Sequence, residues 1–342
     1  MGVLKNIASN WLLSLATIVV TYVLTPFCIH QLGNAGYGTW LLMTSLTGYL
    51  LLLTLGVPMA SVRSMAHYAA EGNDRELNKA IASSAGLYLS LGAAALLIGG
   101  VLYAFFDSTY AVPRGLRSEA RLAFVLVTLY ISAGFVGQLP YGIMAAHHDF
   151  VLRNAVQLAG LILRLGLTIA LLTLRPSLVS LAVVLLATLV FEFSVMWIVV
   201  KRRYPTVRLR VRDFDKREIR LIFSFSLFVL VLNVGERLMF QSDALVIGAF
   251  LDVADIPYYA VANSLGLYLM EFVIAIAAVI MPTATKLHAQ GQRQGLEEVF
   301  LKWSKIALSL TLMAGLFLLV LGPRFVGWWI DPAYEKPSGR VL

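Results

Sequence analysis

The segment AAEGNDRELNKA, residues 69–80, has a counterpart later in the chain, AQGQRQGLEEVF, residues 289–300. The two segments share an alanine, a glycine and a leucine, 219 positions apart: Ala70, Gly72 and Leu77 in the first, and Ala289, Gly291 and Leu296 in the second. A second pair, DSTYAVPRG at 107–115 and DPAYEKPSG at 331–339, matches at an offset of 224. Repetition at a fixed period indicates a chain made of two copies of one unit.

The composition is that of a membrane protein. Of the 342 residues, 59% are hydrophobic and 13% are charged, with a mean hydropathy of +0.80. A soluble domain carries about 25% charged residues. The sequence therefore predicts an all-α polytopic membrane protein. Its net charge of +8 lies mostly in the loops, where it indicates topology and not a nucleic-acid partner.

The apolar segments are long enough to cross a bilayer, which takes about 20 residues in a helix. About nine are expected, near residues 10–30, 37–60, 81–106, 122–146, 154–174, 177–200, 221–250, 257–281 and 302–330. The repeat places residues 1–215 in a first six-helix unit and 216–342 in a second. A second unit of equal length would end at about residue 440. We therefore expect the second repeat to be incomplete and the chain to be a fragment.

Lysine and arginine gather in alternate loops. The richest stretch is KRRYPTVRLRVRDFDKREIR, residues 201–220, whereas the loop LDVADI, residues 251–256, has neither. The positive-inside rule places the rich loops, and with them the N-terminus, in the cytoplasm. We expect a multi-pass membrane protein. The basic stretch is expected to attract anionic lipids of the inner leaflet.

Signatures of enzymes and metal sites are absent from the sequence. Cys28 is the single cysteine, and there is no P-loop, no HExxH and no GxSxG motif. His147 and His148 are interpreted as solvated loop residues and not as metal ligands. We therefore expect no enzymatic activity, no cofactor and no metal.

Polar side chains interrupt the apolar segments. In LNVGERLMFQSD, residues 232–243, the Glu236–Arg237 pair falls near the centre of a predicted helix. A charge at that depth costs at least about 2.5–3.5 kcal/mol, so such residues face a wet cavity or one another. The candidates are Gln157, Arg164, Asn233, Glu236, Arg237, Asp243, Asn263 and Glu271. Both interpretations, a cavity and pairs that lock the bundle, remain open on the sequence.

Three stretches resemble the Wzx-type oligosaccharide flippases of the multidrug/oligosaccharidyl-lipid/polysaccharide (MOP) superfamily. They are NWLLSLATIVVTYVLTPFCIHQLGNAGYGTWLL (10–42), EGNDRELNK (71–79) and QSDALVIGAFLDVADIPYYAVANSL (241–265). The resemblance implies a MOP/MATE-like two-repeat bundle that lies in a bacterial cytoplasmic (inner) membrane and opens alternately to each side. Its expected substrate is an undecaprenyl-pyrophosphate-linked oligosaccharide, such as the O-antigen units of lipopolysaccharide, and its expected partners are glycan-assembly proteins.

The resemblance also implies roles for the candidate residues. Arg164 and Arg237 would meet the pyrophosphate, since guanidinium binds phosphate oxygens in pairs. Sugar hydroxyls would contact Gln157, Asn233 and Asn263, and a coupling H⁺ or Na⁺ would bind at Glu236, Asp243 or Glu271. The alternatives are a MATE-like cation-coupled drug exporter, which an acidic cavity would suit, and a non-transporting fragment. A membrane polymerase or glycosyltransferase would need longer loops.

Overall fold

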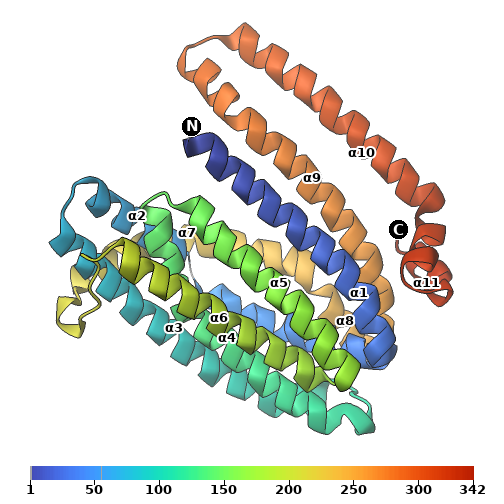
Figure 1. The fold of residues 1–342 in the computed structure, drawn as a ribbon. Helices are drawn as coiled ribbons and strands as arrows, with labels where there is room; N and C mark the ends of the chain where they lie inside the picture. Colours follow the sequence, from blue (N-terminus) through green and yellow to red (C-terminus); the bar gives the residue numbers. More distant parts are fainter. Residues whose placement is uncertain (1, 55) are drawn as a thin grey trace. The chain divides into compact units, whose positions relative to one another are not determined.

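The structure of the chain is a computed structural model that describes residues 2–54 and 56–342. Side chains are described throughout this part except at 2–4, 7, 107, 211, 221, 223–230, 232, 271–272, 275–279 and 282. The described residues form helices joined by short turns, which confirms the all-α prediction (Figure 1).

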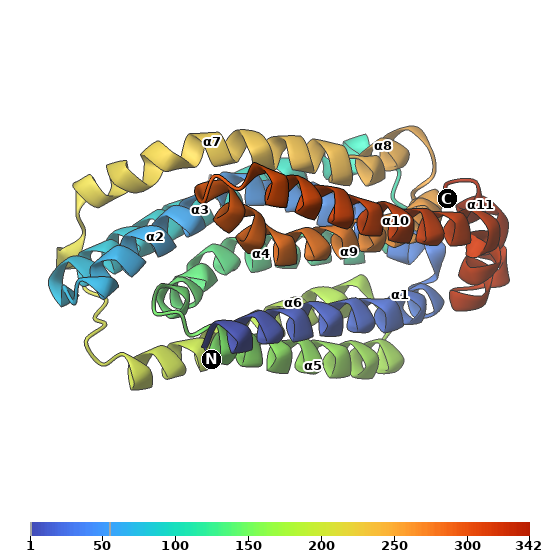
Figure 2. The same ribbon diagram turned by 90° about the horizontal axis from the view of Figure 1, so that it is seen from above.

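The first two predicted segments form one helical stretch with a break. Helix α1 (Gly2–Gly48) contains Gly33 at φ 68° and ψ 170°, and the chain turns back there (Figures 1 and 2). A positive φ of this kind favours glycine, because other residues would place a Cβ against the backbone. The second arm continues through a 3₁₀ turn, η1 (Tyr49–Thr54), and then α2 (Val57–Ala70).

Four long helices follow and match the predicted segments. They are α3 (Asp74–Thr109), α4 (Arg117–Ala146, after the 3₁₀ turn η2, Arg114–Leu116), α5 (Phe150–Leu174) and α6 (Leu178–Arg203). The core lies among them, and its largest fully buried side chains include Tyr88, Phe106, Phe124 and Met144. Phe106 of α3 and Phe124 of α4 have ring centroids 5.2 Å apart, so aromatic packing joins these two helices.

The segment expected to be one helix over 221–250 is divided. After the 3₁₀ turn η3 (Val211–Asp213), α7 spans Lys216–Gln241 and α8 spans Asp243–Phe250. Ser242 lies between them, and its hydroxyl donates to the carbonyl of Leu238 at 2.8 Å. The 3₁₀ turn η4 (Val253–Asp255) then closes a compact unit that comprises residues 1–256.

Residues 257–342 form a second compact unit. It consists of α9 (Ile256–Ala289), α10 (Arg293–Trp329), the 3₁₀ turn η5 (Pro332–Tyr334) and the short α11 (Glu335–Gly339). Within it, the Ser338 hydroxyl donates to the carbonyl of Tyr258 at 2.8 Å, and the rings of Tyr258 and Tyr334 lie 4.6 Å apart. These contacts fix the end of the chain to the start of α9.

The turn from which the repeat was inferred has the same geometry in both copies. Gly72 and Gly291 adopt φ 66° and 68°, between α2 and α3 and between α9 and α10. Their amides donate to the carbonyls of Ala69 and His288, which are again 219 positions apart. The second pair of blocks differs, because Asp331 accepts a bond from the Ala333 amide outside a helix whereas residue 107 lies inside α3. The repeat boundary at 215 stays a prediction.

Six helical stretches within the described residues are long and apolar enough to cross a membrane. They are Ala8–Ala70, Asp74–Phe106, Arg114–Ala146, Phe150–Leu174, Leu178–Arg203 and Arg293–Trp329. The first contains two of the predicted segments, on either side of Gly33. The predicted segments at 221–250 and 257–281 include side chains that lie outside the described set.

Candidate functional site

One face of α5 carries a row of polar residues at helical spacing. Asn154, Gln157, Gly160 and Arg164 follow one another at intervals of three, three and four, which places them along the same side of the helix. Asn154 is buried, Gln157 is half-buried and Arg164 is exposed. The row therefore runs from the packed end of the helix to a surface where Arg164 is exposed.

Glu192 of α6 meets this row. A Cβ added at Gly160 would overlap the Glu192 carboxyl group, so the missing side chain at 160 makes room for the acid. The Tyr141 hydroxyl of α4 donates a hydrogen bond to the same carboxylate. Arg164 lies close enough for its charge to act on Glu192. Three helices thus bring an acid, a phenol and a guanidinium together within the apolar spans. Of these three groups, only the guanidinium of Arg164 is among the site residues predicted above.

Several buried polar atoms beside this row have no hydrogen-bond partner among the described residues. They are Arg153 Nε, Asn154 Oδ1 and Gln157 Oε1. The Asn154 amide group itself donates to Ser9 Oγ at 3.0 Å and to Asn10 on α1. Buried polar atoms are nearly always satisfied by protein or by water. The region around Gln157 is therefore suited to a polar ligand or to water.

A second arginine lies where α7 approaches the end of α1. Arg237 is half-buried and donates to the side-chain oxygen of Gln241, one turn further on. Its Nη1 would lie 3.3 Å from a Cβ at Gly48, so glycine allows the close approach. Next to it, the Tyr49 and Ser242 hydroxyls are hydrogen-bonded at 2.9 Å. Arg237 is thus held by a neutral partner and forms no ion pair among the side chains that the structure describes.

The other predicted site residues have different surroundings. Asn233 is half-buried on α7, Glu236 is exposed, and Asp243 is the first residue of α8 and not part of a continuous helix. Asn263 is half-buried on α9 in the second unit, and the Glu271 side chain lies outside the described residues. No ion pair joins Arg164, Glu236, Arg237 or Asp243 to another residue within the described part of the chain. Mutual locking by salt bridges therefore finds no support among these four.

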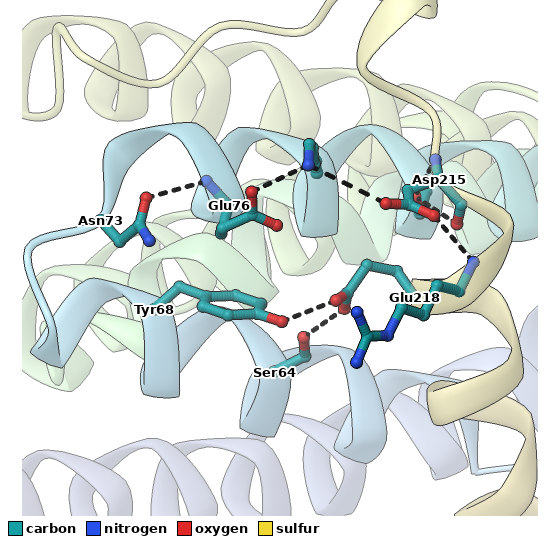
Figure 3. Close-up of polar contacts among 9 residues, drawn as sticks. Ser64, Tyr68, Asn73, Glu76, Asp215 and Glu218 are labelled. Atoms are coloured by element: carbon teal, nitrogen blue, oxygen red, sulfur yellow. Dashed lines mark hydrogen bonds and ion pairs between the residues drawn. The ribbon is translucent and has the colours of Figure 1, made fainter.

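A buried carboxylate at the start of α7 was not predicted. Glu218 is 5% exposed and accepts hydrogen bonds from Ser64 Oγ at 2.8 Å and Tyr68 OH at 2.6 Å, both on α2 (Figure 3). Figure 3 also shows the neighbouring ion pairs, in which a lysine bridges Glu76 and Asp215. That lysine, Lys79, lies 2.8 Å from Glu76 and 4.0 Å from Asp215. These contacts attach α7 to the α2–α3 hairpin.

The turn between α4 and α5 is attached to the end of α6 in a similar way. Asp149 accepts from Arg203 Nε at 2.6 Å and from the Tyr204 hydroxyl. The bond from Arg203 holds the pKa of Asp149 below its ordinary value, while burial and the bond to Asp149 raise the pKa of Tyr204 to about 12. His147 lies in the turn as predicted, but it is half-buried and stacks on Tyr204 at 4.1 Å, so it is less solvated than expected. His148 is exposed, and no cluster of three metal-ligating side chains occurs in the described part.

Comparison with known proteins identifies the fold. Residues 3–288 match the family described as "Polysaccharide biosynthesis protein". The chain is 22% identical to the uncharacterized membrane protein EpsK of Bacillus subtilis, across 96% of this chain and 66% of that protein, so it spans just under two thirds of this relative's length.

Solved structures agree on the architecture. An inward-facing multidrug resistance MATE transporter of the MOP superfamily superposes with a TM-score of 0.73 at 18% identity, covering 94% of this chain and 75% of that one. A MOP superfamily transporter from Pyrococcus furiosus, described as having a binding pocket of reversed polarity, gives a TM-score of 0.68 at 16% identity, with coverage of 99% and 75%. The chain is an all-helical membrane protein with the MATE/MOP fold.

Proposed function

We propose, because this chain belongs to the polysaccharide biosynthesis protein family, that it moves a diphosphate-linked oligosaccharide lipid across the membrane. The family and fold are those of MOP superfamily transporters and not of enzymes. The finer assignment, a Wzx-type flippase for an undecaprenyl-pyrophosphate-linked glycan in a bacterial cytoplasmic membrane, is part of this proposal. So is the cytoplasmic position of the N-terminus.

The observation that carries the proposal is the pair of arginines without a direct ion pair among the described residues. Arg164 and Arg237 lie within predicted membrane-crossing segments, neither forms an ion pair among the described residues, and the nearest hydrogen-bond acceptor of Arg237 is neutral. A charge in a membrane span is expensive and is retained where it serves a ligand or an ion pathway. Guanidinium groups bind diphosphate oxygens in a bidentate manner, which gives these residues a role in the proposed substrate class.

The remaining candidates fit the sugar and the coupling ion. In the proposal, Gln157 with its unpartnered oxygen and the amides of Asn233 and Asn263 bind sugar hydroxyls. The acids Glu236, Asp243 and Glu271 remain the proposed sites for H⁺ or Na⁺. Proposed partners are the lipid-linked glycan, the surrounding lipids and glycan-assembly proteins.

A cation-coupled drug exporter is the second candidate. The observation that favours it is Glu192, an acid within the apolar spans whose carboxylate is hydrogen-bonded by Tyr141. Acids of this kind suit cationic substrates or coupling protons. The two candidates differ in which side chains are essential: arginines for a diphosphate, Glu192 for a cation.

Complementation separates them. The protein would be expressed in a strain that lacks its glycan flippase, beside Arg164→Ala, Arg237→Ala and the charge-preserving Arg164→Lys and Arg237→Lys. Arg175→Ala, which removes an exposed arginine at the end of α5, is the control. We expect rescue by the wild type and the control, partial rescue by the lysine variants and none by the alanine variants at equal membrane levels. Rescue by the alanine variants equal to that by the wild type would refute the assignment of the arginines to the substrate. Drug tolerance without rescue by the wild type would refute the flippase.

A further inference from the structure

The linker between α6 and α7 is hydrogen-bonded to α3 at several points along its length. We call residues 204–215 the strap. Asn78 of α3 donates to the Thr206 carbonyl at 3.0 Å and accepts from the Arg208 amide at 2.7 Å. Five residues further along α3, Ser83 donates to the Asp215 carbonyl at 3.2 Å and accepts from its amide at 2.9 Å. The side chains of Asn78 and Ser83 thus each donate one hydrogen bond to the strap backbone and accept one from it.

Apolar contacts reinforce this docking. Val207 packs on the hydrophobic core, and the Phe214 ring occupies the space that a Cβ at Gly86 would enter. Tyr204, at the start of the strap, is held by Asp149. The strap is thus held at its start by Asp149, near its middle by Asn78 and at its end by Ser83. Its remaining side chains therefore have defined positions.

Those side chains are arginines. The strap reads VRLRVR over residues 207–212, so apolar and basic residues alternate. Arg208 and Arg210 are both exposed and line a cavity of about 330 Å³. The full lining is Asp74, Arg75, Asn78, Thr206, Arg208, Arg210 and Asp213.

The charges of this cavity favour an anion. Three guanidinium groups face two carboxylates, and none of the three arginines forms an ion pair within the described part of the chain. Arg75 comes from α3 and the other two from the strap, so donors converge from two elements. Guanidinium groups placed in this way bind phosphate oxygens with paired, charge-assisted hydrogen bonds.

The cavity lies at one end of a helix that is apolar enough to cross a membrane. Asp74 is the first residue of α3, and Asp74–Phe106 is the stretch of sufficient length and hydropathy. The strap at the same end belongs to the segment richest in lysine and arginine. Basic segments next to a membrane helix attract anionic lipid headgroups.

We propose that the Arg75–Arg208–Arg210 cavity binds the phosphate-ester headgroup of a lipid in the leaflet that faces the strap. The headgroup can belong to the diphosphate-linked carrier, which rests on the proposed function, or to an anionic phospholipid, which does not. Both share the phosphate ester that the guanidinium groups recognise. The site is separate from Arg164 and Arg237 on the membrane-crossing helices, and it would hold the headgroup before or without transport.

Equilibrium binding tests the site without any transport. The purified protein in nanodiscs would be titrated with polyprenyl diphosphate in one arm and phosphatidylglycerol in the other. The test variants are Arg75→Gln alone and Arg208→Gln with Arg210→Gln. The matched control is Arg202→Gln with Arg212→Gln, which removes the same charge from the same basic stretch at positions outside the cavity lining. Thermal melting checks that every variant is folded.

We expect both test variants to weaken binding about tenfold or more in at least one arm, since each lost charge-assisted pair is worth one or more factors of ten. The arm that responds identifies the lipid. Equal weakening by the test and control pairs would show general attraction to charge and would overturn the proposal. So would unchanged binding of both lipids. If the protein fails complementation but binds phosphatidylglycerol in a way that depends on these arginines, only the proposed function is overturned.

Discussion

The carboxyl group of Glu192 occupies the space that a side chain at residue 160 would fill. Gly160 on α5 and Glu192 on α6 are in direct contact, and the Tyr141 hydroxyl on α4 donates to the acid. The absence of a Cβ therefore permits an ionisable group to sit between two membrane-crossing helices. Small residues allow such close approach in membrane bundles generally.

Gly160→Ala is expected to destabilise the protein. The added methyl group would displace the Glu192 carboxyl, and overpacking of this kind costs about 1–3 kcal/mol. The measurement is the melting temperature of the purified protein in detergent, where we expect a drop of several degrees. Gly166→Ala on the same helix is the control, because nothing lies within 4 Å of its added Cβ.

A double-mutant cycle assigns the cause. In a Glu192→Ala background the obstacle is gone, so Gly160→Ala is expected to lose most of its effect. An equal drop in both backgrounds would show that the alanine acts on something other than Glu192.

Glu218→Gln is expected to loosen α7 from α2. The carboxylate accepts from both Ser64 and Tyr68, whereas an amide offers one acceptor and turns an NH₂ group toward the other hydroxyl. Loss of hydrogen bonds to a buried charge costs about 1.5–3 kcal/mol, which lowers the free energy of unfolding. Thermal melting measures this, and trypsin cleavage after Lys216 or Arg217 reports local opening. The exposed Glu71→Gln should change neither, and identical behaviour of the two variants would contradict the assigned role of Glu218.

Asp149→Asn is expected to remove a pH-dependent contribution to stability. The Arg203 hydrogen bond holds the folded-state pKa of Asp149 below its ordinary value of 3.8. A depressed pKa stabilises the fold at pH values above the ordinary one, and this contribution is lost as the pH falls below 3.8 and through the folded value. The melting temperature of the variant should therefore lie below that of the wild type at pH 7.

The gap should close as the pH is lowered toward 3. Asp255→Asn, at an exposed acid of the same unit, is the control and should follow the wild type across the range. A gap that is constant with pH would mean that Asp149 acts through its shape and not through its charge.

Local features of this fold were predictable from the sequence. The turns at Gly72 and Gly291 follow from a short motif, and their hydrogen bonds are formed between neighbours in the chain. The long helices follow from the length of the apolar runs. Even the two arms of α1 were expected, because a glycine-containing stretch separates the segments at 10–30 and 37–60.

The contacts between helices could not be predicted in the same way. Tyr68 and Glu218 are 150 positions apart, and Tyr141 and Glu192 are 51 apart. Periodicity tells which residues share a face of one helix, but not which face of another helix it meets. The break at Ser242 was missed for the same reason, since its hydroxyl meets Tyr49 from a distant part of the chain as well as Leu238.

The hydrogen bonds between Glu218 and α2 have a practical consequence for protein engineering. A chimera that takes its first half from this chain and its second half from a relative would be cut at residue 215 if the predicted boundary were followed. That crossover would give Ser64 and Tyr68 a foreign residue in place of Glu218, whose hydrogen bonds they supply. A junction placed after Glu218, inside α7, keeps this carboxylate with the two hydroxyls of α2 that donate to it.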